Sequence, residues 1–121
     1  MTGDEAALFS MIDDARTSRG CAPLGRDSNL SGTAQQEADS RASSGDVSST
    51  ESSSAAAGGD NMSAQEAFNT LKSQSSGTIY NCGLNELGVG QATTQYRPGG
   101  LLCGLGLCAK RTRVAWVVDF K

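Results

Sequence analysis

The final segment of the chain, RTRVAWVVDFK (residues 111–121), constrains the fold more than any other part of the sequence. In an extended strand, successive side chains point to opposite faces of the sheet. The residues that would share one face are Val114, Trp116, Val118 and Phe120. Ala115 and Val117 would lie on the other face. Because apolar residues fall on both faces, we expect a central strand in a sheet that is covered on both sides.

A second strand is predicted over ELGVGQATTQY (residues 86–96), where Gly88 and Gly90 flank Val89. Glycine within a strand indicates a bulge or the close approach of another backbone. A phosphate-binding role would need glycines that lead into a helix, whereas these lead into a strand. RPGG then predicts a turn. The following LLCGLGLC is apolar but interrupted by glycine, and fits a strand, a bulged strand or a closed loop.

Three helices are predicted before these strands. They span residues 2–20, 27–45 and 63–74, and each has an apolar or small-residue stripe at helical spacing. Thr2 with Glu5 and Ser63 with Glu66 have the spacing of capping boxes. In the second helix, alanines spaced four residues apart would let another element approach closely. Helices that precede strands favour an α+β fold, with the helices packed on an antiparallel sheet.

The segment between the second and third helices is rich in serine and glycine. DVSSTESSSAAAGGDN (residues 46–61) offers few apolar groups to offset the entropy lost on ordering, so we expect a mobile surface loop. TIYNC (residues 78–82) is expected to be a short extended piece or a turn. The length of 121 residues predicts a single domain over residues 1–121.

The chain contains four cysteines: Cys21, Cys82, Cys103 and Cys108. An even number in a small polar domain favours disulfides and an oxidising compartment, and three pairings are open. Zinc is the competing interpretation, but only Cys103 and Cys108 are close in sequence and the chain has no histidine. A redox-active pair is a further alternative, although CGLGLC lacks the CxxC spacing and the helix start that activate a thiol.

Charge is unevenly distributed along the chain. The net charge is −3, which does not favour nucleic acid as a partner, yet most bases lie in the second half. They include Arg97, Lys110, Arg111, Arg113 and Lys121. These bases can protect a strand edge, or they can form a patch for an anionic envelope polymer or lipid head group. No apolar run reaches the roughly 20 residues of a membrane span, and no signal peptide is present, so we expect a mature chain that is secreted or lies in the cell envelope.

Several stretches together resemble the CAP superfamily, which comprises cysteine-rich secretory proteins, antigen 5, pathogenesis-related 1 proteins and small bacterial SCP-like relatives. FSMIDDARTSRGCAPLGRDSNLSGTAQQEA resembles the opening of the family, with its Asn/Asp-x-x-Arg helix and Pro-Leu turn. GGDNMS is similar to Gly-Glu-Asn, NELGVGQ to Glu-x-Gly-Val-Gly, and VAWVVDF to the last strand. The resemblance implies a three-layer α-β-α sandwich in one CAP-like domain. It also implies that Gly88 and Gly90 let a strand pass close beneath a covering helix.

The resemblance further implies a cleft in which two histidines and two acids hold a divalent metal. Both histidine positions are vacant here: one falls in or near residues 42–53, the other around residues 74–76. Asp60 matches the glutamate of Gly-Glu-Asn, and Glu66 is a candidate second acid that its capping box explains equally well. Without imidazole the zinc ligands and the proton shuttle are missing, so we expect no metal and no cofactor.

Serine-based catalysis also lacks a required residue in this sequence. Serine cannot be activated by a histidine that the chain does not contain, so no catalytic residue is predicted. Tyr80 and Tyr96 could contact a ligand such as haem, but we expect half-buried strand residues with solvated hydroxyls.

The leading hypothesis is therefore a secreted, non-catalytic and monomeric CAP-like binding module for a partner protein, lipid or envelope component. Its candidate binding residues are Asp60, Asn61, Glu66, Arg111 and Arg113. The alternatives are a metalloprotein or enzyme that uses carboxylates and thiols, and a redox protein that uses the last two cysteines. For the disulfides we predict a local Cys103–Cys108 loop and a long-range Cys21–Cys82 bond between the first turn and the start of the sheet.

Overall fold

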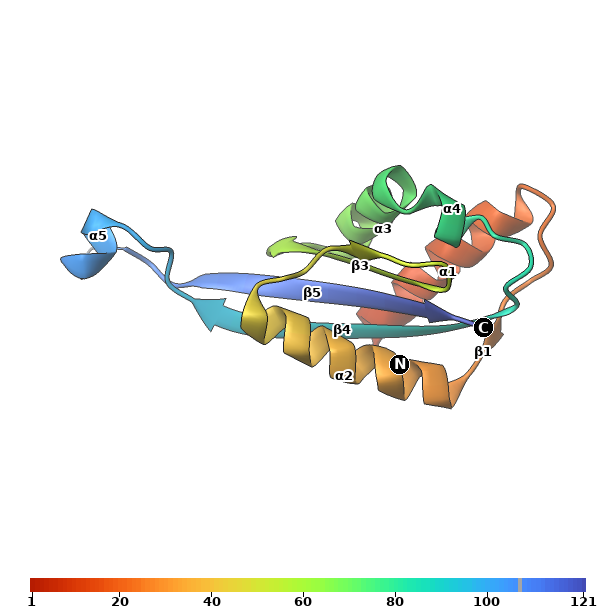
Figure 1. Ribbon diagram of the computed structural model, residues 1–121, viewed down its shortest axis with the longest axis horizontal. Coiled ribbons are helices and arrows are strands. Elements are labelled where there is room, and N and C mark those ends of the chain that lie inside the picture. Colours follow the sequence, from red (N-terminus) through yellow and green to blue (C-terminus); the bar gives the residue numbers. More distant parts are fainter. Residues whose placement is uncertain (107) are drawn as a thin grey trace.

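A computed structural model describes residues 1–106 and 108–121, which are arranged in three layers (Figure 1). The helices are α1 (Gly3–Thr17), α2 (Ser28–Ser44), α3 (Ala64–Gln74), α4 (Ser76–Ile79) and α5 (Leu101–Gly104). The strands are β1 (Gly25–Arg26), β2 (Ser49–Thr50), β3 (Ser54–Asp60), β4 (Glu86–Tyr96) and β5 (Arg111–Phe120). Helix α2 covers one face of the sheet, whereas α1, α3 and α4 lie over the other. The predicted α-β-α sandwich is confirmed.

Strand β5 is central, as its apolar pattern predicts. The described strands form a five-stranded sheet in the order β1-β4-β5-β3-β2. All neighbours pair antiparallel except β1, which pairs parallel with the start of β4. Trp116, fully buried, packs into the main core beneath α1 and α3, while Val117 packs against the alanines of α2. The strand thus supplies the apolar surface for both helical layers.

The predicted starts of the three helices are confirmed by their N-caps, whereas α1 ends at Thr17, before the predicted stop at Gly20. Thr2 and Glu5 form a capping box at the start of α1, and Ser63 and Glu66 form another at the start of α3. Asp27 caps α2 by accepting hydrogen bonds from two backbone N–H groups. Glu5 also has a second role, since its Oε2 accepts a hydrogen bond from the backbone N of Gln91 at 2.8 Å.

The prediction of a mobile loop over residues 46–61 is wrong for Ser49–Thr50, which form β2, and for its second half. Residues Ser54–Asp60 form β3, which pairs antiparallel with β5 over its whole length. Residues 55–57 are alanines that are at most 2% exposed. Alanine gives little periodic hydrophobic signal, but a small side chain next to a central strand can be buried completely. The neighbour β5 therefore orders a segment whose own composition does not favour order.

Two further local predictions hold only in their turn or loop alternatives, and their extended alternatives are wrong. Ser76–Ile79 is the single helical turn α4, so TIYNC does not begin as an extended piece, and Tyr80 follows a helix rather than lying in a strand. Tyr96 does lie in a strand, at the end of β4. Leu101–Gly104 forms the helical turn α5 in place of the strand considered for LLCGLGLC, of which residue 107 is outside the described residues.

Both predicted disulfides are confirmed. Cys21–Cys82 spans 61 residues of sequence, with its Cα atoms 5.0 Å apart, and ties the turn after α1 to the segment before β4. Cys103–Cys108 spans only five residues, with a Cα separation of 4.8 Å, and closes a local loop.

The close approach predicted for the β4 glycines is also confirmed. A β-carbon built on Gly88 would lie 2.2 Å from the backbone N of Ser31, and one on Gly90 would lie 2.3 Å from the carbonyl carbon of Ala34. Real β-carbons do not approach other atoms this closely. Glycine therefore lets α2 pack directly on the sheet.

Arg16, the arginine of the Asn/Asp-x-x-Arg pattern, is fully buried. Its Nη1 donates to the carbonyl oxygen of Ile79 at 2.7 Å, and its Nη2 donates to that of Leu84 at 2.5 Å. Burial lowers the pKa of the Arg16 guanidinium, while the nearby Asp13 carboxylate raises it. An arginine remains charged at neutral pH even so, and it holds the loop between α4 and β4 against α1.

Candidate functional site

The ends of three adjacent strands bring together most of the candidate binding residues. Asp60 ends β3, Tyr96 ends β4, and Arg111 begins β5. The Tyr96 hydroxyl donates to Asp60 Oδ1 at 2.6 Å, and Arg111 Nη1 lies 3.6 Å from Asp60 Oδ2. Arg113, across from Asp60 in the β3–β5 register, completes this group. We call Asp60, Tyr96, Arg111 and Arg113 the Asp60 cluster.

Arg113 fixes the cluster to the layer beneath it. Its guanidinium carbon lies 4.2 Å from the centre of the Tyr96 ring, a distance at which cation and ring attract. Its Nη1 also donates to the carbonyl oxygen of Ala42 at 2.9 Å, near the end of α2. The side chain is thus held from two sides and its position is preorganised.

The electrostatics of the cluster restrict its chemistry. The hydrogen bond from the Tyr96 hydroxyl to Asp60 raises the pKa of Tyr96, with further raising by desolvation and by the Asp60 charge. The phenol is therefore protonated at neutral pH and cannot act as a phenolate base. Two arginines outnumber the single carboxylate, so the cluster carries net positive charge.

The other two candidate residues, Asn61 and Glu66, are not part of the cluster and make different contacts. Asn61 has a positive φ of 54° and donates its backbone N–H to the carbonyl oxygen of Thr112 at 2.9 Å. Asparagine tolerates this left-handed conformation better than most residues, and Asn61 is the first residue after β3. Glu66 Oε1 accepts from the backbone N of Ser63 at 3.1 Å, so its observed contact is the helix cap.

The two segments in which the CAP resemblance predicts vacant histidine positions, residues 42–53 and 74–76, border a hollow of about 460 Å³. Hydroxyl groups line their contact. The Thr50 and Ser75 hydroxyl oxygens are 2.5 Å apart, and the Thr78 hydroxyl donates to the carbonyl oxygen of Glu51 at 2.5 Å. These groups supply hydrogen bonds but no imidazole nitrogen. Asp60 and Glu66 do not line this hollow. The two candidate acids therefore do not lie in the same hollow as the segments with the vacant histidine positions.

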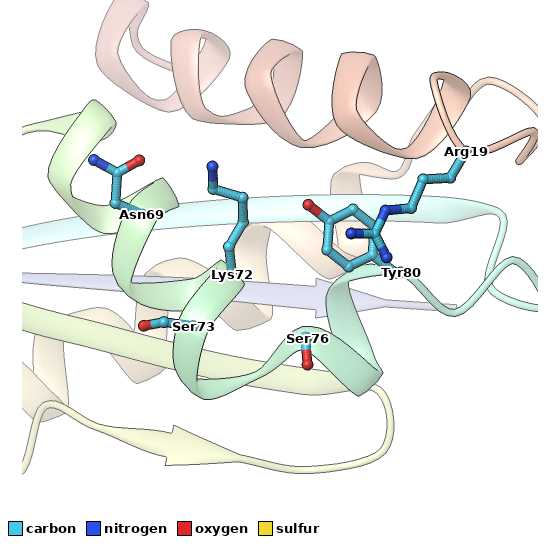
Figure 2. Close-up of a pocket in the computed structure, with 6 residues that line it drawn as sticks. All are labelled: Arg19, Asn69, Lys72, Ser73, Ser76 and Tyr80. Carbon is cyan, nitrogen blue, oxygen red and sulfur yellow. The ribbon is translucent and has the colours of Figure 1, made fainter.

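A second hollow, of about 490 Å³, was not anticipated from the sequence. Figure 2 shows Arg19 from the turn after α1 reaching toward Tyr80, with Lys72 of α3 nearby. The Arg19 guanidinium carbon lies 3.6 Å from the centre of the Tyr80 ring. These side chains converge from segments far apart in the chain, and each alone has an ordinary surface pattern, so no sequence signal could have indicated the hollow.

Carboxylates and cysteines, which can donate to a metal, are spread over the described residues. Within residues 1–106 and 108–121, no group of three or more histidine, cysteine, aspartate or glutamate side chains is positioned to hold a metal ion. The described residues also include no helix with the length and apolar character of a membrane span.

Asp119 is a buried acid on the α2 side of β5, and its Oδ1 accepts a hydrogen bond from the Ser54 hydroxyl at 2.7 Å. Burial raises its pKa from the ordinary value of 3.8, and the charge of Glu51 acts in the same direction. The Ser54 hydrogen bond and the Arg41 charge oppose this rise.

The raised pKa predicts a pH dependence of stability. Above pH 3.8 the unfolded state releases the Asp119 proton before the folded state does, so the free energy of unfolding falls as pH rises toward the folded pKa. Asp119→Asn removes this effect. We therefore expect the free energy of unfolding of the variant, minus that of the original chain, to be larger at neutral pH than in acid. Urea unfolding of both proteins at both pH values measures this difference. A stability difference that does not change with pH would contradict the assignment.

Comparison with known proteins supports the fold. No family model matches the chain, and no curated protein matches it. Among solved structures, the crystal structure of MpPR-1i, a pathogenesis-related protein 1, superposes with a TM-score of 0.67 at 16% identity and covers 100% of this chain and 90% of that one. A crystal of MpPR-1i soaked with selenourea gives a TM-score of 0.65 at 16% identity, with coverage of 100% and 94%. The disulfides and these neighbours fit an extracellular protein. At this identity the likeness shows the fold alone: the chain is built like a pathogenesis-related 1 protein.

Proposed function

We propose that this chain is a secreted binding module that holds an anionic partner at the Asp60 cluster and does not transform it. The observation that carries the proposal is the closed set of contacts in the cluster. Asp60 is engaged by Tyr96 and by Arg111, and Arg113 is held by the Tyr96 ring and an α2 carbonyl. A preorganised, positively charged surface favours binding because little order is lost when the partner arrives.

The same contacts argue against catalysis at this surface. A general base must be free to accept a proton and near neutral in pKa, whereas Asp60 is already engaged by a donor and a cation. The chain has no histidine to activate a hydroxyl or thiol. A carboxylate or phosphate group on a protein, lipid or envelope component is the chemistry that paired arginines recognise.

The binding role can be tested by extraction. The chain is purified from its native setting, and co-purifying lipids and small molecules are identified by mass spectrometry. We expect an anionic molecule to co-purify with the original chain. The double variant Arg111→Gln with Arg113→Gln should retain at least about tenfold less of it, because at least one charge-assisted hydrogen bond to the molecule is lost. Arg26→Gln removes a cation from β1 and should retain it fully. Equal recovery from all three proteins would contradict the proposal, and thermal unfolding checks that each is folded.

The rival metalloprotein hypothesis has a separate test. Zinc and magnesium are titrated into the oxidised protein by calorimetry. We expect no affinity tighter than about 10 µM, which corresponds to about −7 kcal/mol. Tighter binding would favour a metal site built from carboxylates. A Cys103–Cys108 disulfide that opens readily in glutathione would instead favour the redox hypothesis.

A further inference from the structure

The connection between β4 and β5 projects from the molecule and carries exposed apolar side chains. We call its described residues, 97–106 and 108–110, the tip. Figure 1 shows α5 of the tip lying well beyond the helices that cover the sheet. Leu101 is 80% exposed and Leu105 is 64% exposed, the highest values among the large apolar residues that the structure describes. Grouped apolar side chains at a protruding position are typical of an interaction site.

The tip is held in shape by its own covalent bond. The Cys103–Cys108 disulfide closes it, and the sulfurs of both cysteines lie near the carbonyl oxygen of Pro98. Helix α5 adds one turn of regular backbone between Leu101 and Gly104. A cross-linked loop loses less conformational freedom on binding than an open one. The exposed leucines are therefore presented by a preorganised support rather than by a free chain.

Basic residues flank the leucines in sequence. Arg97 precedes the tip's helix, Lys110 follows the disulfide, and both are exposed. The sequence from residue 87 to residue 118 contains no acid. Across the described part of the chain, no carboxylate lies within ion-pair distance of Arg97 or Lys110. The tip thus combines exposed leucines with positively charged residues where it joins the strands, although the whole chain has a net charge of −3.

This combination fits one kind of partner best. A stable protein interface buries about 800 Å² on each side, which two leucine side chains on a narrow projection cannot provide. A lipid surface needs less: apolar side chains enter the boundary between head groups and acyl chains, and each nearby Lys or Arg adds about fivefold in affinity for an anionic membrane. The absence of acids in the same stretch makes its charge complementary to such a membrane.

We infer that the tip docks on an anionic lipid bilayer, with Leu101 and Leu105 entering the head-group boundary and Arg97 and Lys110 contacting lipid phosphates. This inference rests on the proposed binding role and names its partner. The C-terminus lies at the other end of β5 from the tip, so docking leaves it pointing away from the membrane (Figure 1).

The inference is tested with the full oxidised chain and lipid vesicles. Co-sedimentation is measured with vesicles of phosphatidylcholine mixed with phosphatidylglycerol, and with phosphatidylcholine alone. We expect binding to the mixed vesicles that weakens as added salt shortens the Debye length, and at least about tenfold weaker binding to phosphatidylcholine. Arg97→Gln with Lys110→Gln should weaken binding to the mixed vesicles roughly 25-fold.

The apolar contribution is tested by a matched pair of variants. Leu101→Ser with Leu105→Ser should weaken binding to the mixed vesicles by about tenfold or more. Leu101→Met with Leu105→Met keeps the apolar surface and should bind like the original chain. All the tip variants should unfold at the same temperature as the original chain, because the tip contributes to neither buried core cluster.

Several outcomes would overturn the inference. They are no binding to either vesicle, equal binding to both, and unchanged binding by the serine variant. Sedimentation equilibrium without lipid that shows a dimer abolished in the serine variant would make a second copy of the chain the occupant. Failure with vesicles leaves the binding role standing if extraction still yields a ligand that depends on Arg111 and Arg113, so the two proposals fail separately.

Discussion

Gly90→Ala should lower the free energy of unfolding by at least about 3 kcal/mol, because the added methyl group would overlap the backbone of α2. The new β-carbon would lie 2.3 Å from the carbonyl carbon of Ala34, and 2.4 Å from both the Ala34 oxygen and the Gln35 nitrogen. No flexible side-chain end can move aside, since all three atoms belong to a helix backbone. Either α2 must lift from the sheet, which would open the alanine-lined core, or β4 must shift away from β5.

Urea unfolding followed by circular dichroism measures this effect. Gly59→Ala is the matched control, since it also adds a methyl group to a strand glycine but would meet only the mobile end of Met62, at 3.5 Å. We expect this control to change the free energy of unfolding by less than about 0.5 kcal/mol. Similar values for the two variants would show that α2 does not need glycine at this crossing.

Arg16→Met should lower the free energy of unfolding by about 4 kcal/mol, because it removes the donors to one buried and one partly buried carbonyl group. Methionine keeps most of the side-chain stem, so the expected loss comes from the hydrogen bonds to Ile79 and Leu84. Hydrogen bonds from a charged group contribute roughly 1.5–3 kcal/mol each, and an unpaired buried carbonyl adds its own penalty. Lysine has a single ammonium in place of the planar guanidinium with its two Nη donors. The stability of Arg16→Lys should therefore lie between those of Arg16→Met and the original chain.

The readout combines urea unfolding with hydrogen exchange of the amides in residues 79–86. Exchange should accelerate there more than in β3, because this loop loses its anchor to α1. Arg19→Met removes an exposed arginine three positions further along and should lower stability by less than about 1 kcal/mol. If Arg16→Met matched this control, the buried guanidinium would be dispensable for holding the loop.

The parts of the fold that could be predicted have strong local signals. The apolar residues on both faces of β5 indicate a central strand, and the glycines of β4 indicate a close approach, because each pattern has few other physical explanations. Strand β3 could not be predicted, since Ala55, Ala56 and Ala57 have no periodicity and become buried only when β3 pairs with β5 between the two helical layers. Helix α4 is similar: the Thr78 hydroxyl bonds to the Glu51 carbonyl, a contact between segments far apart in sequence.

The candidate site was accessible to sequence reasoning only in part. Asp60, Arg111 and Arg113 stand out by charge, and the structure brings them together. The role of Tyr96 in joining them depends on the β4–β5 register, in which Tyr96 lies opposite Arg111. The hollow beside Arg19 and Lys72 depends on how α1 and α3 pack, which no local pattern encodes. Residues that act together through tertiary contact are therefore the ones that sequence reasoning misses.

The hydrogen bond from Gln91 to Glu5 also has a consequence for self-association. Past Leu87, the outer edge of β4 pairs with no strand in the described part of the chain, and an open edge with free N–H groups is a template for another chain. The carboxylate of α1 occupies one of these donors midway along the edge. An incoming strand would have to displace the buried carboxylate of Glu5 from the Gln91 N–H. Glu5 therefore opposes the addition of another strand at this edge, as in fibril-like stacking.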